Sequence, residues 1–185
     1  MDTLRKVGIC ILLLGNMLWV YGADRPYRVL FIQSYMETDP WSEAMKQGIE
    51  DGFRNASLDI ELTVEYLQAH YWNARQEEQV MYDICLWAIE TETDLILTAY
   101  DEALYSLWAC RDSLDLSIPV VFFGVEFLNH EVLVQFPDVT GYVTPPRYKE
   151  MLQTAKSLFP ERKRVINVTS NSRFIKRAYE RYLED

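Results

Sequence analysis

The chain has 185 residues, with 18 Lys and Arg against 28 Asp and Glu and a formal net charge of −10. Binding to nucleic acid needs clustered Lys and Arg to neutralise phosphates, so this acidic balance excludes nucleic acid as a partner. His70 and His130 lie far apart in the sequence, and neither has a nearby Cys or His. We therefore expect no metal site and no cofactor.

Residues 1–22 have the pattern of a secretory signal peptide. Arg5 and Lys6 form a short positive segment, residues 7–20 are apolar, and a possible cleavage site ends at Gly22. The apolar run is shorter than the ~20 residues that a membrane-spanning helix needs. We therefore expect export by the general secretory route to the periplasm or cell envelope. Retention of the segment as a membrane anchor is the alternative.

The rest of the chain alternates predicted strands and helices. Residues 27–33 and 118–125 are almost continuously apolar, as are parallel strands that are covered on both faces. Residues 59–66 alternate apolar and polar side chains, which predicts a strand with one less buried face, and 94–99 is a further strand. Short connections between such elements predict an α/β fold with a doubly wound parallel sheet and right-handed crossovers.

Periodicity and capping residues predict the helices between these strands. The first, at 37–54, has Asp39 as its N-cap and an apolar face that comprises Trp41, Met45, Gly48, Ile49, Gly52 and Phe53. The second begins after Asn73, which forms a capping box with Gln76, and its buried face comprises Val80, Ile84, Trp87 and Ala88. The third covers 101–110.

After the fourth strand the pattern changes. The predicted elements are a short helix at 129–136, an extended stretch at 139–143, a helix at 147–159, a strand at 164–169 and a helix at 172–184. The last strand and its two helices cannot bury a core of their own. We therefore expect one whole lobe at 24–140, and at 141–185 a hinge with the start of an incomplete second lobe. The sequence is then a fragment or a truncated product of a longer protein.

Two cysteines follow the predicted signal peptide, Cys85 and Cys110, and both lie on predicted helices. An exported protein can join such a pair in a disulfide bond. The alternative is two buried free thiols, because cysteine often serves as a small buried hydrophobic residue. We favour the free thiols on the sequence alone.

Ligands of open α/β sheets bind beyond the carboxyl ends of the strands. The residues predicted at those ends offer hydroxyl, amide, carboxylate and aromatic groups for a small molecule: Gln33, Ser34, Tyr35, Trp41, Ala99, Tyr100, Asp101, Gly124, Val125, Glu126, Ser170 and Asn171. Alternative roles remain open for some of them. Ser34 and Asp101 are also suited to capping helices, and Tyr35 and Trp41 to covering the core.

Motifs of catalysis are missing from the sequence. It has no Gly-x-Ser-x-Gly turn, no phosphate-binding loop and no Gly-x-Gly-x-x-Gly. Asp101, Glu102 and Glu126 are possible acids and bases, but carboxylates without a nearby nucleophile, metal or histidine are weak evidence for chemistry. We expect a binding protein and not an enzyme, with a hydrolase at this crevice as the alternative.

Several segments, in this order and spacing, carry a family resemblance: residues 28–35, 94–99, 117–122, 139–141 and 158–165. Together they resemble the ABC-transporter substrate-binding family with the type I periplasmic-binding fold. The nearest variant is the sensor domain ahead of Bacteroides-type membrane histidine kinases. The resemblance implies two lobes that close on a small molecule, and a membrane permease or a sensor kinase of a two-component system as partner. A fragment of such a kinase, with its catalytic part beyond residue 185, is the alternative, and so is a non-functional remnant.

Overall fold

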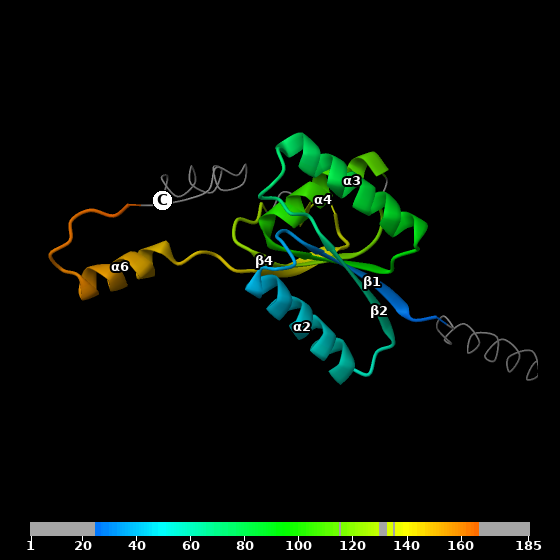
Figure 1. Cartoon of the computed structure of the whole chain (residues 1–185), viewed down its shortest axis with the longest axis horizontal. Helices are drawn as coiled ribbons and strands as arrows, with labels where there is room; N and C mark the ends of the chain where they lie inside the picture. The colour runs from blue at the N-terminus through cyan, green and yellow to red at the C-terminus, as the bar shows by residue number, and fades with distance from the viewer. Residues whose placement is uncertain (1–24, 115, 130–132, 135, 167–185) are drawn as a thin grey trace, which may run out of the picture.

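The computed structural model describes residues 25–114, 116–129, 133–134 and 136–166, and it contains one five-stranded sheet with helices on both faces (Figure 1). All neighbouring strands are parallel, in the order β2-β1-β3-β4-β5. The predicted α/β fold with a doubly wound sheet is therefore confirmed. The elements are β1 (Tyr27–Gln33), α2 (Pro40–Asn55), β2 (Ile60–Tyr66), α3 (Ala74–Glu90), β3 (Leu95–Ala99), α4 (Tyr100–Leu114), β4 (Val120–Val125), β5 (Val139–Val143) and α6 (Tyr148–Leu158).

The strands β1, β2 and β3 end at the same position along the sheet. Gln33, the last residue of β1, lies opposite Tyr66 of β2 on one side and Ala99 of β3 on the other. These are also the last residues of their own strands. Because the three carboxyl ends are level, the segments that follow β1, β2 and β3 all leave the sheet at the same edge.

The sheet separates two hydrophobic cores. Its larger core lies under α3 and α4 and includes Leu30 and Ile32 of β1. Its smaller core lies under α2 and includes Phe31 of the same strand. Side chains alternate between the two faces of a strand, so an unbroken apolar run such as that of β1 supplies both cores.

The helix N-termini confirm the predicted caps. The Asp39 side chain accepts a hydrogen bond from the Trp41 backbone N–H at 2.8 Å, at the start of α2. Asn73 and Gln76 form the predicted capping box at the start of α3. These signals are local, so the sequence contains all the information that they need.

The predicted buried faces of α2 and α3 need correction. In α2 the buried or packed positions are Ser42, Met45, Ile49 and Phe53, whose spacing follows the helical repeat. Trp41 is one residue out of step with this face and is 70% exposed, and Gly48 and Gly52 are exposed as well. In α3 Ile84 and Ala88 are buried as predicted, but Trp87 is 37% exposed.

An ion pair joins the segment before β1 to the residue before β3. Arg25 makes two hydrogen bonds to the Asp94 carboxylate, at 2.7 and 3.0 Å, and the backbone N–H of Arg28 donates to the same carboxylate at 2.9 Å. The Arg25 hydrogen bond is the largest cause of the lowered pKa of Asp94. Asp94 immediately precedes β3, so this contact joins the starts of two neighbouring strands.

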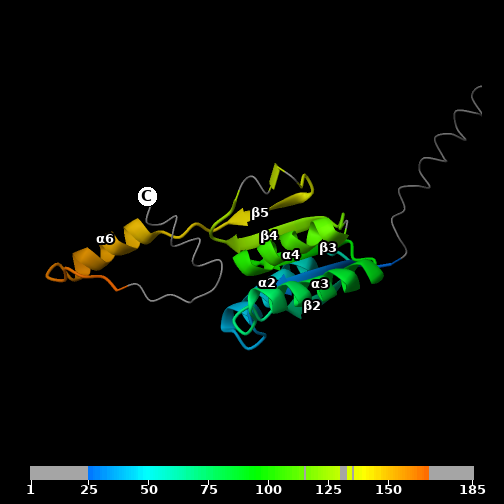
Figure 2. The same cartoon turned by 90° about the horizontal axis from the view of Figure 1, so that it is seen from above.

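The segment after β5 lies apart from the sheet. Helix α6 has no buried residue and extends away from the layered core (Figure 2). Residues 164–166 do not form the beginning of the predicted strand, and the rest of that strand and the helix predicted at 172–184 lie outside the described residues. The predicted signal peptide lies outside them too. Within the described ranges, no helix has the length and apolar character to cross a membrane.

Candidate functional site

The candidate site lies at the carboxyl ends of β1 and β3. Helix α2, which follows β1, covers one face of the sheet, while α4, which follows β3, covers the other. Such a switch point opens a crevice between the two strand ends. The predicted site residues of 33–35, 99–101 and 124–126 meet at this edge, whereas Ser170 and Asn171 lie outside the described residues.

Ser34 is a buried link between β1, β3 and α4. Its hydroxyl donates to the Ala99 carbonyl at 2.6 Å and accepts from the Ala103 backbone N–H at 2.9 Å. It therefore caps a free N–H of the first turn of α4 and not of the helix that follows it in sequence. With both bonds made inside the protein, this hydroxyl belongs to the floor of the site.

Three more predicted residues form the same floor. Gln33 is fully buried and donates from Nε2 to the Ser42 carbonyl at 3.0 Å. Ala99 and Val125 are also fully buried. The sequence located these positions correctly at the sheet edge, but their side chains point into the two cores.

Asp101 holds the loop that follows β4. Its carboxylate accepts hydrogen bonds from the backbone N–H groups of Glu126 at 2.8 Å and Phe127 at 3.0 Å. Burial raises the pKa of Asp101, and these two bonds oppose that rise. The capping role for Asp101 is wrong, because this residue lies inside α4 and binds a different segment. The Tyr105 hydroxyl holds the same loop, since it donates to the Phe127 carbonyl at 2.6 Å.

Two residues with left-handed backbone bring the ends of β3 and β4 together. Tyr100 has a φ of 71° and Gly124 a φ of 67°. A Cβ on Gly124 would lie 3.3 Å from the Tyr100 ring. A non-glycine residue at positive φ costs free energy, and such strain is often found at functional sites. Glycine at 124 avoids both the strain and the close contact.

A group of aromatic rings lines the crevice. Tyr35 stacks on His70 with ring centres 4.5 Å apart and an interplanar angle of 5°, and it lies 5.0 Å from the Tyr100 ring. The Tyr35 hydroxyl donates to Glu102 Oε2 at 3.3 Å. Burial, and then the Glu102 charge, raises the pKa of Tyr35. Sequence analysis missed His70, although its place just after β2, at the edge shared with β1, is a usable signal.

Carboxyl groups with raised pKa values surround these rings. Glu102 is 5% exposed, and burial raises its pKa to about 7, with Asp101 and Glu77 adding to the rise. Burial also raises the pKa of Glu126, and the nearby Asp101 charge adds to it. Among the described residues, no cationic side chain contributes to any of these shifts.

The Tyr100 ring marks the place where these charges converge. Burial raises its pKa first, followed by the charges of Asp39, Glu126 and Glu102. These three carboxylates come from three segments: the N-cap of α2, the end of β4 and the first turn of α4. Carboxyl groups from three segments therefore lie close to one aromatic ring.

The rim of the crevice keeps aromatic surface in contact with water. Trp41 is 70% exposed, so the alternative of Trp41 as a cover on the core is wrong. The Tyr71 hydroxyl donates to the Met36 sulfur at 3.0 Å, which joins the loop after β2 to the loop after β1. Tyr35, in contrast, packs on neighbouring rings as described above.

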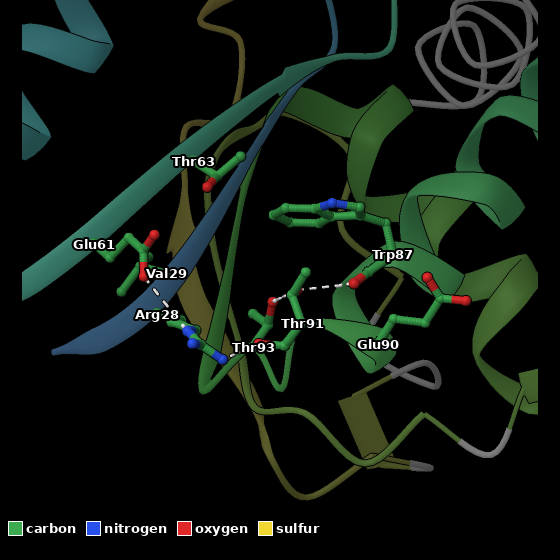
Figure 3. A pocket seen from close by; sticks show the side chains of 8 residues that line it. All are labelled: Arg28, Val29, Glu61, Thr63, Trp87, Glu90, Thr91 and Thr93. Carbon is green, nitrogen blue, oxygen red and sulfur yellow. Dashed lines mark hydrogen bonds and ion pairs between the residues drawn. The ribbon is translucent and has the colours of Figure 1, made fainter. Parts of the chain in front are cut away.

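Two cavities lie away from this edge, between β2 and α3. One of about 330 Å³ is lined by Trp87, Arg28, Thr63 and Glu90, among others (Figure 3), and a second of about 280 Å³ shares Trp87. The polar face of β2 points towards α3, so the helix does not seal against the sheet there. In the described ranges, no group of three or more Cys, His, Asp or Glu residues is placed to hold a metal ion.

No protein-family model matches the sequence, and no curated protein matches it either. By structure the chain is similar to several solved proteins. A conserved domain protein from Vibrio cholerae O1 biovar El Tor has 16% identity and a TM-score of 0.56, over 74% of this chain and 45% of that one. The ABC domain in complex with L-Trp from Streptococcus pneumoniae has 12% identity and a TM-score of 0.55, over 73% and 44%. A ligand-free, open substrate-binding protein with adhesive properties from Clostridium difficile has 14% identity and a TM-score of 0.54, over 85% and 54%.

This chain spans about half the length of those three structures. At such low identity the likeness shows the fold alone. The partial coverage is consistent with an incomplete lobe. The described residues therefore have the α/β fold found in substrate-binding proteins.

Proposed function

We propose that this chain recognises a small molecule outside the cytoplasm, as the ligand-binding part of an uptake or sensing system. The observation that carries the proposal is the group of aromatic rings and carboxyl groups at the switch point, which stands on a floor that is already hydrogen-bonded. The similar structures include a substrate-binding protein and a domain solved with L-Trp, which supports binding rather than catalysis. A membrane permease or a sensor kinase is the proposed partner.

The chemistry of the crevice favours a ligand with an ammonium group and a flat ring. Glu102 and Glu126 have raised pKa values and no cationic partner among the described residues, so a bound ammonium would lower the free energy of their ionised forms. Tyr100 and the exposed Trp41 offer ring faces for stacking and for cation–π contact. An aromatic amino acid or an aromatic amine combines the two features.

The described edge contacts a ligand from one side. Small-molecule sites usually bury most of the ligand surface, which an open sheet edge cannot do alone. The proposed second side comes from the residues after β5, with Ser170 and Asn171 as candidates. Closure of two such lobes on a ligand would provide the conformational signal that a membrane partner reads.

The test measures the melting temperature of the purified chain by differential scanning calorimetry with four probes. L-tryptophan and tryptamine carry a ring and an ammonium group, indole-3-propionate lacks the ammonium group, and L-alanine lacks the ring. We expect the first two to raise the melting temperature at millimolar concentration and the other two to leave it unchanged, because only ligands that bind the folded state stabilise it.

Two tryptophan variants locate the site. Trp41→Ala should weaken binding of L-tryptophan roughly fivefold, the magnitude of one aromatic contact, with little change in melting temperature because the ring is exposed. Trp87→Ala, in the cavity between β2 and α3, should leave the affinity unchanged. Loss of binding in the Trp87 variant alone would move the site to that cavity, and no response to any probe would contradict the proposed ligand class.

A further inference from the structure

The two cysteines of the described chain face each other across two packed helices. Cys85 lies on α3 and Cys110 on α4, and both belong to the core cluster on that side of the sheet. Cys85 is fully buried, Cys110 is 5% exposed, and both thiols are free in the structure. The sequence placed them on separate helices but carried no information on whether those helices bring them together.

The two thiols interact with each other and with the backbone of α3. The Cys85 thiol donates to the Cys110 sulfur, and this bond is the largest cause of the raised pKa of Cys85. The Cys110 thiol in turn lies 3.7 Å from the Glu78 backbone carbonyl, which it approaches as a donor. Cys110 thus reaches the backbone of α3 as well as the Cys85 side chain. The two side chains therefore meet in the core cluster between the packed helices α3 and α4.

We propose that Cys85 and Cys110 form a disulfide bond that ties α3 to α4 when the chain folds in an oxidising compartment. The Cys110 thiolate attacks a sulfur of a disulfide donor, such as oxidised glutathione or an oxidised thiol–disulfide oxidoreductase, and releases one donor thiolate. The Cys85 thiolate then attacks the Cys110 sulfur of this mixed disulfide and releases the second. The protein loses two electrons and two protons, and the donor is reduced to two thiols.

Burial decides when this reaction happens. A donor cannot reach sulfur atoms that are 0% and 5% exposed in the folded protein, so exchange takes place before the core closes or during local opening. Once formed, the bond shortens the free chain of the unfolded state by closing a loop of about 25 residues, which stabilises the folded state. It would also fix α4, whose first turn carries Tyr100 and Glu102, against α3.

The test is refolding of the 185-residue chain in a glutathione redox buffer, followed by alkylation in denaturant and peptide mass mapping. Trypsin cleaves after Arg75 and Arg111 and at no site between them, so both thiols fall in the single peptide 76–111. We expect that peptide to remain unalkylated and to be lighter by two hydrogen atoms than its reduced form. Cys10, in a different peptide, should be alkylated. Alkylation of both Cys85 and Cys110, or a link from either to Cys10, would overturn the proposal.

Thermal melting supplies an independent readout. Oxidised wild-type chain should melt roughly 10 °C above the reduced chain, as expected for a loop of this length in a domain of this size. The double variant Cys85→Ala with Cys110→Ala should melt at the same temperature in both buffers. A wild-type chain that melts lower when oxidised would show that the bond opposes the native packing, and would overturn the proposal even if the mass mapping found it.

Discussion

Replacement of Ser34 by alanine tests whether this residue is part of the floor or part of the ligand surface. The change removes a hydroxyl that makes hydrogen bonds of 2.6 and 2.9 Å at a fully buried position. It leaves the Ala103 backbone N–H without its acceptor, and an unsatisfied buried donor costs about 1–3 kcal/mol. A cost of about 2 kcal/mol, the middle of that range, at about 2–4 °C per kcal/mol in a domain of this size should lower the melting temperature by roughly 4–8 °C.

Ser42 provides the matched control, because it is also fully buried but its hydroxyl has no partner among the described residues. Removal of an unpartnered buried hydroxyl relieves a desolvation cost, so Ser42→Ala should leave the melting temperature unchanged or raise it. The assay is thermal unfolding followed by circular dichroism, with urea titration for the free energy of unfolding. Equal destabilisation in both variants, or an unchanged Ser34→Ala protein, would refute the reasoning.

Two further predictions concern stability. A Cβ at Gly141 would lie 2.0 Å from the Phe122 carbonyl oxygen, whereas one at Gly48 would meet nothing within 4 Å. Gly141→Ala should therefore lower the free energy of unfolding by about 3 kcal/mol and Gly48→Ala raise it by about 0.5 kcal/mol in urea titrations, and equal effects would contradict the β4–β5 pairing. Because burial raises the pKa of Glu102 to about 7 from 4.5, the folded state holds a proton that the unfolded state has released between these pH values. Wild-type stability should fall relative to Glu102→Gln as pH rises from about 4.5 to about 7, by up to about 3 kcal/mol in total, and level off above 7; parallel pH profiles of melting temperature would contradict this.

Patterns confined to short segments predicted the fold well. The apolar run of β1 has the same bounds in sequence and structure, at 27–33, because a strand covered on both faces needs no polar positions. The caps at Asp39 and Asn73 were equally accessible, since a cap bonds to residues two or three positions away. Alternation of such elements was then sufficient to predict the parallel, doubly wound sheet.

The candidate site was predictable in position but not in the role of each side chain. The site lies at the carboxyl ends of the strands, and the sequence predicts where those strands end. Whether Ser34 faces a ligand or the interior depends on Ala99 and Ala103, more than sixty residues away, and on the angle at which α4 leaves the sheet. The place of His70 just after β2 is a signal that the sequence contains, but its stacking on Tyr35 depends on the pairing of β1 with β2.

The ion pair between Arg25 and Asp94 fixes the edge at which the described chain enters the sheet. It holds the start of β1 at the edge of the sheet opposite to the crevice, and the seven residues of β1 separate the two edges by roughly 20 Å. The described chain therefore enters the sheet at the edge farthest from the strand ends that form the candidate site, so Arg25 and the site residues lie at opposite edges of one sheet.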